Sequence, residues 1–154
     1  MTDAEKAAMP KIHPETLPAV TQTGYLPPHN VPVQGRSRTL IAAAGGLTQF
    51  GANLVTLAPG AWSSQRHWHT AEDELVVVLT GTLILVENSC ETAMHPGDIA
   101  AFKAGAANGH HLQNRSAAAA SFLAIGTDNP ETDQCHYPDI DMFWSEATGF
   151  TTKP

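Results

Sequence analysis

GAWSSQRHWHTAEDELVVVLTG, residues 60–81, is the stretch that decides how this chain folds. It contains two histidines, His67 and His69, that are two positions apart. On a β-strand this spacing places both imidazoles on one face, whereas on a helix it splays them far apart. The two histidines are therefore able to chelate an ion only if this segment is a strand.

A carboxylate, Glu74, follows the histidine pair at an odd distance from His67. On one uninterrupted strand it would face the opposite side, but residues 70–73 are short, polar and typical of a turn, and an apolar run follows them. A turn there brings Glu74 back to the histidines. Imidazole nitrogens and one carboxylate suit zinc, iron, manganese, cobalt or nickel, and the candidate for a fourth ligand is His110.

The spacing G-x6-H-x-H-x4-E-x6-G resembles the first motif of the cupin family. This resemblance puts His67, His69 and Glu74 at the metal-ligand positions of that motif. The second cupin motif has a counterpart in GDIAAFKAGAANGHHLQN, residues 97–114. Its glycines, third histidine and asparagine correspond to Gly97, Gly105, His110 and Asn114. The resemblance implies one bound divalent transition metal, either zinc, iron, manganese or nickel.

Two adjacent histidines compete for the position of the third imidazole ligand. Neighbours on a strand alternate between its faces, so only one of His110 and His111 reaches the ion. His110 lies four residues before Asn114, which is the spacing of the second cupin motif. Two extra residues after Gly105 depart from the motif, as does Lys103 in place of its usual proline, and they leave His111 open as the alternative.

Short apolar segments separated by turn residues fill residues 39–128. Strands are expected near residues 49–58, 62–69, 74–79, 82–87, 99–102, 110–114 and 119–126. Several short strands at regular spacing predict an all-β sandwich or barrel. The cupin resemblance implies that this barrel is a double-stranded β-helix, or jelly roll.

The barrel is expected to lie between an extended arm, residues 1–38, and a tail, residues 129–154. Six of the eleven prolines occur in the first 32 residues, which excludes long helices there. The tail is acidic and is expected to pack on the outside of the barrel. Its apolar anchors are Tyr137, Ile140, Met142, Phe143 and Trp144. The alternative is that His136 and Tyr137 edge the mouth of the pocket.

Strand parity also selects residues that would contact a substrate. If His67 and His69 face the interior, Gln65 shares their side and becomes a candidate substrate-binding residue, with a packing role as its alternative. His111 and Asn108 are further candidates. The Asn108-Gly109 pair is also typical of a turn, and this interpretation is favoured.

Composition excludes several classes of partner. The 154 residues carry a formal net charge of −7 with only eight Lys and Arg, which are scattered, so neither nucleic acid nor an anionic membrane is an expected partner. The first residues lack an apolar signal segment, and no apolar stretch approaches the roughly 18 residues of a membrane span. We therefore expect a cytoplasmic protein. Cys90 and Cys135 are expected as reduced thiols, with a bridge between them as the alternative.

The segment ELVVVL, residues 74–79, is apolar at both strand parities. Both of its faces should lie away from water, one inside the barrel and the other against a second sheet or subunit. We expect a homodimer, because two-fold homo-oligomers are the commonest kind. A monomer with the arm folded back on its own barrel explains the same sequence.

Three imidazoles and one carboxylate leave coordination positions for an oxygen-bearing small molecule. The first hypothesis is a metal-dependent enzyme that acts on a small polar, carboxylate or sugar-like substrate, as a dioxygenase, isomerase, lyase, decarboxylase or hydrolase. The second is a non-catalytic module that binds a small ligand. It is favoured by the lack of a recognisable nucleophile or general acid. A barrel with an empty site is disfavoured by the four matched ligand positions.

Overall fold

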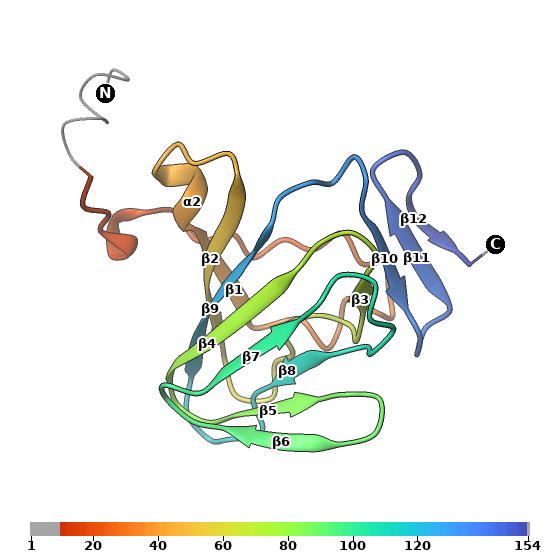
Figure 1. Cartoon of the computed structure of the whole chain (residues 1–154). Coiled ribbons are helices and arrows are strands. Elements are labelled where there is room, and N and C mark those ends of the chain that lie inside the picture. Colours follow the sequence, from red (N-terminus) through yellow and green to blue (C-terminus); the bar gives the residue numbers. More distant parts are fainter. Residues whose placement is uncertain (1–9, 154) are drawn as a thin grey trace.

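The computed structural model describes residues 10–153 and is almost entirely β (Figure 1). Its strands are β1 (Arg36–Leu40), β2 (Phe50–Leu57), β3 (Trp68–His69), β4 (Glu74–Thr80), β5 (Leu83–Val86), β6 (Glu91–Met94), β7 (Ile99–Phe102), β8 (His111–Gln113), β9 (Ala120–Thr127), β10 (Gln134–Tyr137), β11 (Met142–Ser145) and β12 (Gly149–Thr152). Two short helical segments accompany them, η1 (Pro14–Thr16) and α2 (Ile41–Ala44). Neither is long or apolar enough to cross a membrane, and this holds for every helix of the described residues.

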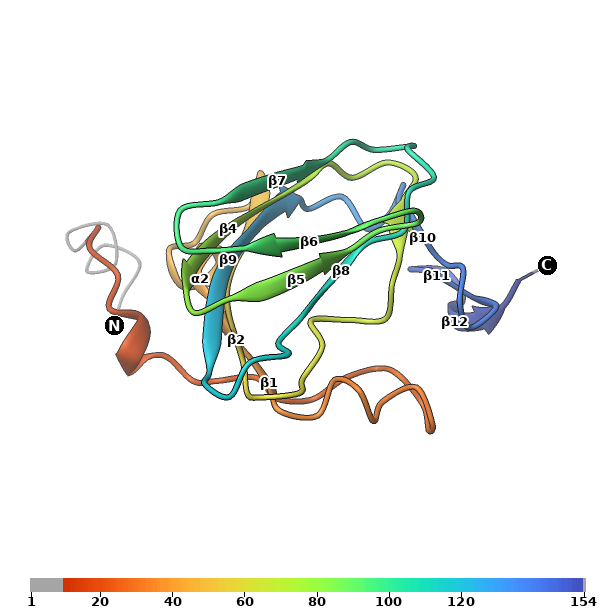
Figure 2. The same ribbon diagram turned by 90° about the horizontal axis from the view of Figure 1, so that it is seen from below.

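Two antiparallel sheets enclose the core, and Figure 2 shows them curving around a common interior. One has the strand order β1-β2-β9-β4-β7, and the other has the order β6-β5-β8. Buried side chains of both sheets meet between them, with Leu57 of β2 and Leu83 of β5 fully enclosed. Full burial of such a side chain stabilises the fold by about 1.5–3 kcal/mol. The prediction of an all-β jelly roll is confirmed.

The strand β4 buries one of its two apolar faces. Val76 and Val78 are buried in the core, whereas Leu79 on the other face is exposed. The strand is followed by Gly81, whose φ is +74° and whose added Cβ would lie 2.7 Å from the Cβ of Ala120. Only glycine satisfies both conditions at this turn.

The expected strand over residues 62–69 is only partly present. Regular pairing is limited to β3, and the preceding segment makes isolated bridges from Trp62 to Gln113 and from His67 to His110. The reason is that the hydroxyl of Ser63 accepts a hydrogen bond from the Leu112 amide, where a regular ladder would use a backbone carbonyl. The segment therefore follows β8 irregularly.

The tail forms a sheet that the sequence did not predict. Strands β12, β11 and β10 continue onto β3, and the register of β10 places Cys135 opposite His69 and His136 opposite Trp68. The rings of Trp68 and His136 stack, with centroids 4.5 Å apart. The tail thus extends the strand that carries the histidines. Strand β6 was also missed, because its sequence ETAM has little apolar alternation.

The arm lies against the barrel of its own chain over the part that the structure describes. Val20 exchanges backbone hydrogen bonds with Arg38, and the Trp62 amide donates to the carbonyl of Pro32. Tyr25 of the arm packs edge-on against Tyr137 of the tail, with ring centroids 5.6 Å apart. The arm and the tail therefore meet at one end of the barrel.

Candidate metal centre

The four residues predicted as metal ligands come from three neighbouring segments. His67 and His69 lie at β3, Glu74 begins β4, and His110 directly precedes β8. His67 and His110 are held side by side by two backbone hydrogen bonds, from each amide to the other carbonyl. Local pairing thus places three imidazoles at one end of the barrel.

Ligand atoms of His67, Glu74 and His110 lie within 4.8 Å of one another, and His69 approaches the same carboxylate. The Oε2 atom of Glu74 lies 3.2 Å from Nε2 of His110, and it lies 3.8 Å from the Nε2 atoms of His67 and of His69. Three imidazole nitrogens and one carboxylate oxygen therefore surround a common space. The turn over residues 70–73 produces this arrangement, because it redirects the chain between His69 and Glu74.

The opposite nitrogen of each imidazole, Nδ1, has an oxygen acceptor. The pairs are His67 with the Gln65 carbonyl at 2.9 Å, His69 with Oδ2 of Asp133 at 2.6 Å, and His110 with the Asn108 carbonyl at 3.2 Å. Such acceptors would keep a proton on Nδ1 while Nε2 gives up its own proton to coordinate an ion. Three Nε2 atoms and the carboxylate of Glu74 are a donor set that suits a divalent transition metal.

The carboxylate of Glu74 is ionised in this environment. Burial would raise the pKa of Glu74, but the imidazoles of His110 and His67 outweigh burial and hold that pKa well below its ordinary value. In the same way, burial lowers the pKa of His67, and contact with Glu74 more than offsets this and raises it. An ionised carboxylate is the form that coordinates a metal.

Asp133 is a site residue that sequence reasoning missed. It is buried, its Oδ2 accepts from His69, and its Oδ1 accepts from the amide of Ala71. Carboxylates that bind the outer nitrogen of a metal-ligating histidine orient the ring and make it a stronger ligand. Asp133 reaches His69 because β10 pairs with β3. An acidic residue directly before a short apolar alternation was its only signal in the sequence.

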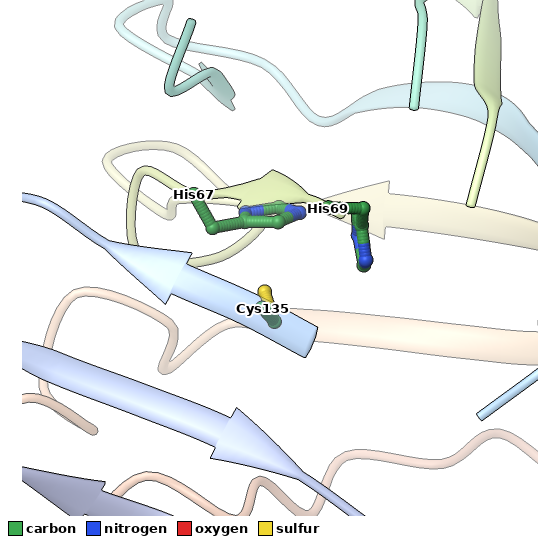
Figure 3. A group of neighbouring side chains, drawn as sticks. All are labelled: His67, His69 and Cys135. Atoms are coloured by element: carbon green, nitrogen blue, oxygen red, sulfur yellow. The ribbon is translucent and has the colours of Figure 1, made fainter. Parts of the chain in front are cut away.

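Cys135 also lies close to the histidines. Figure 3 shows its sulfur directed from β10 toward the rings of His67 and His69, and ligand atoms of the three residues lie within 4.8 Å of one another. Cys135 is buried and unpaired. Burial raises the pKa of its thiol to about 12, so the thiol is protonated in the metal-free protein at neutral pH.

His111 is turned away from the convergence point. Its Nδ1 donates to the Ser64 carbonyl at 2.8 Å, and its Nε2 accepts from the amide of Gln113 at 2.9 Å. Burial lowers the pKa of His111 to about 4, so its ring is neutral. Because both nitrogens are used, this ring has no lone pair for an ion. The geometry therefore favours His110 over His111 as the third imidazole ligand.

The remaining candidates have mainly structural contacts. Gln65 is buried and donates from Nε2 to the carbonyl of His29 in the arm, so the structure favours its packing alternative. The Asn108 side chain donates to Glu87 and accepts from the Asn88 amide. The side chain of Asn108 therefore stabilises the loop before His110. The backbone carbonyl of Asn108 orients the ring of His110.

Several hollows adjoin the cluster, and two of them border three of its four residues each. One is a cavity of about 150 Å³ inside the barrel, which His67, Glu74 and His110 border. The other is a hollow of about 380 Å³ that His67, His69 and Glu74 border together with acidic side chains. A ligand in either hollow would touch the cluster. Arg36 and Arg38 also line the inner cavity, and sequence reasoning did not identify them.

Comparisons with known proteins identify relatives of this arrangement. Residues 53–126 match a family model described as a cupin domain. A sugar phosphate isomerase from a cupin superfamily, from Silicibacter pomeroyi, is 44% identical and superposes with a TM-score of 0.86, over 92% of this chain and 90% of that one. No curated protein matches the chain.

Two further solved structures resemble the chain less closely. A putative sugar phosphate isomerase from Acidithiobacillus ferrooxidans is 28% identical with a TM-score of 0.68, over 71% of this chain and 69% of that one. The polyketide cyclase RemF from Streptomyces resistomycificus is 15% identical with a TM-score of 0.66, over 79% of this chain and 80% of that one. At that identity the last similarity reports the fold alone.

Proposed function

The chain belongs to the cupin superfamily, and from this premise we propose that it is a divalent-metal-dependent enzyme that isomerises a small sugar phosphate. The observation that carries the proposal is the convergence of three imidazole Nε2 atoms on Glu74, at the edge of a cavity. The chemistry is suggested by the 44% identity to a protein described as a sugar phosphate isomerase. That similarity covers nearly the whole length of both chains.

Each residue of the cluster has a definite task in this proposal. His67, His69, His110 and Glu74 would hold the ion. When bound, a divalent ion acts as a Lewis acid toward a carbonyl or hydroxyl oxygen, which is the polarisation that an aldose–ketose interconversion needs. Asp133 keeps the ring of His69 in the orientation and tautomer required for binding.

The surroundings of the cluster also suit a small polar substrate. The hollow beside His69 is bordered by the carboxylates of Glu72, Asp73 and Asp128. Carboxylates at such a position are chemically able to carry the proton that an isomerisation moves between adjacent carbons. The interior cavity is about 150 Å³, so a larger substrate would have to extend into the outer hollow.

The proposal is tested by measuring metal content and turnover on the same preparation. Protein purified without a histidine tag should contain close to one transition metal per chain by elemental analysis. The loaded protein should interconvert an aldose phosphate and its ketose isomer, followed by NMR over a panel of sugar phosphates. His69→Ala should lose both metal and turnover, whereas the exposed His95→Ala should retain both. Metal-loaded protein that leaves the whole panel unchanged would contradict the proposed reaction.

A second candidate function is the binding of a small ligand without chemistry. One observation favours it: among residues 10–153, the only carboxylate that lines the inner cavity is Glu74, which the metal would occupy, and both nitrogens of His111 are used. A ligand held entirely inside the barrel would meet no free acid or base. This function predicts saturable binding of a sugar phosphate to the loaded protein with no change of the sugar.

We also propose that the protein is a homodimer. The outer face of the five-stranded sheet leaves apolar side chains uncovered, among them Ile99, Phe50 and Leu79. An apolar hollow of about 580 Å³ lies on the same face, between Phe50, Leu75 and Ile125. Packing of this face against a second copy would remove these side chains from water.

A further inference from the structure

Two arginines of strand β1 point into the barrel. Arg36 lies opposite Leu57 of β2, and Arg38 lies opposite Val55. Residues directly opposite each other in an antiparallel pair project on the same face, and Leu57 and Val55 belong to the buried core. The sequence R-S-R therefore places both guanidinium groups on the inner face, where strands of a barrel normally carry apolar residues.

Neither arginine has an acidic partner in the part of the chain that the structure describes. The ion pairs of arginine among residues 10–153 join Arg66 to Asp139 and Arg115 to Glu91. Arg36 is only 8% exposed. Its Nη1 donates to the Ser63 carbonyl at 2.7 Å and its Nη2 to the Gln22 carbonyl at 3.5 Å.

Both guanidinium groups also keep an unused donor. The Nε atoms of Arg36 and Arg38 are buried and have no hydrogen-bond partner among the described residues. A buried charge is costly unless an opposite charge and hydrogen bonds compensate it. Burial and then the charge of Arg38 lower the pKa of Arg36, so the two groups oppose each other as well. A bound anion would satisfy the free donors and relieve this repulsion.

The two arginines share the inner cavity with the metal centre. Arg36, Arg38 and Asn53 line it together with Glu74 and His110. Arg38 and Asn53 also border the outer hollow. A small molecule held at the arginines would therefore lie in the same space as the convergence point of the histidines.

We propose that Arg36 and Arg38, with Asn53, form an anion-binding subsite that takes the phosphate or carboxylate end of the ligand. The planar fork of a guanidinium group matches both anions by paired hydrogen bonds. The other end of the ligand, with its hydroxyl or carbonyl oxygens, then faces the metal ligands. This last step rests on the proposed function, whereas anion binding by the arginines requires no metal.

The subsite is tested by titrating metal-free protein with inorganic phosphate in a calorimeter. Arg38→Gln should bind phosphate about ten- to hundredfold more weakly than the wild type, because charge-assisted hydrogen bonds are lost. Arg115→Gln is the matched control, since Arg115 lies on the surface with Glu91, and it should bind as the wild type does. Equal phosphate affinity in wild type and Arg38→Gln would overturn the proposal.

A second measurement needs no substitution at all. Phenylglyoxal modifies arginine side chains, and peptide mass spectrometry resolves the modification at each position. Phosphate should slow modification of Arg38 and leave that of Arg115 unchanged. Unchanged modification of Arg38 would overturn the proposal even if Arg38→Gln did not fold. Malonate replaces phosphate in a parallel series, and the stronger protector identifies the anion that the subsite prefers.

The two proposals fail in distinguishable ways. If the proposed reaction is wrong, metal-free protein still binds phosphate through Arg38, although no sugar phosphate is turned over. If the subsite is wrong, Arg38→Gln changes neither phosphate binding nor the metal content of the loaded protein. Metal content should be normal in Arg38→Gln in either case, since the residue donates no ligand atom to the cluster.

Discussion

The Oδ2 atom of Asp133 lies 2.6 Å from Nδ1 of His69, although the two residues are 64 positions apart in the chain. The contact joins the acidic tail to the histidine strand. It links the folding of β10 onto β3 to the orientation of His69, a proposed metal ligand.

Removal of this carboxylate should weaken metal binding without unfolding the barrel. Asp133→Ala is expected to lower the affinity for zinc about 10- to 100-fold, since the ring of His69 loses its orienting acceptor. Competition with a fluorescent chelator measures the affinity. Asp98→Asn, at an exposed turn, is the control and should bind zinc as the wild type does. Unchanged zinc affinity in Asp133→Ala would show that Asp133 has no orienting role.

The two adjacent histidines should respond differently to substitution. His110→Ala is expected to lose the metal, because Nε2 of His110 is the nitrogen nearest to Glu74. His111→Ala should keep the metal but lose about 3 kcal/mol of unfolding free energy, since a buried ring with two hydrogen bonds is removed. Elemental analysis and urea unfolding measure the two effects. The reverse pattern would transfer the ligand assignment to His111.

The two cysteines should differ in reactivity. Cys90 is exposed, whereas Cys135 is buried, and burial raises the pKa of its thiol to about 12. Iodoacetamide at pH 8 is expected to modify Cys90 and to leave Cys135 intact, because the thiolate is the reactive form. Intact-mass spectrometry should therefore find one added group on the native protein and two after unfolding in urea. Rapid double modification of native protein would contradict the buried placement of Cys135.

The proposed dimer should depend on the outer face of the five-stranded sheet. Ile99 is 61% exposed on this face. A carboxylate at this position would be buried in the proposed interface, so Ile99→Glu is expected to yield monomers. Light scattering after size-exclusion chromatography measures the mass in solution. Thr92→Glu lies on β6 of the other sheet and should leave the dimer intact. A wild-type protein of monomeric mass would refute the dimer itself.

The turn glycine after β4 should tolerate no side chain. Gly81 has a positive φ, and an added Cβ would lie 2.7 Å from the Cβ of Ala120. Gly97 also has a positive φ, but apart from its chain neighbours no described residue comes within 4 Å of an added Cβ. Gly97→Ala is therefore expected to lower the free energy of unfolding by about 1–2 kcal/mol, from backbone strain alone. Gly81→Ala should cost at least about 1 kcal/mol more from steric overlap, as measured by urea unfolding. Equal losses of unfolding free energy in Gly81→Ala and Gly97→Ala would contradict the steric overlap at Gly81.

Much of the fold and part of the site were predictable from local sequence. The spacing of His67, His69 and Glu74, with a polar turn between them, is a short-range pattern whose geometry follows from strand periodicity. The same holds for the buried face of β4. The strands of the tail were not predicted, because their short apolar runs resemble ordinary surface anchors until they pair with β3.

The sequence by itself determined an all-β chain of short strands with two histidines in chelating register, because these properties depend on neighbours along the strand, and its resemblance to the cupin motifs implied the jelly roll. Only the tertiary structure decided which groups complete the site. Asp133 and the inward arginines Arg36 and Arg38 are brought to the cluster by strand pairing. The difference between His110 and His111 lies in their hydrogen-bond partners, two of which, Glu74 and Ser64, are distant in sequence. Long-range contacts of this kind leave no periodic trace in the sequence, since either partner alone looks like an ordinary polar residue.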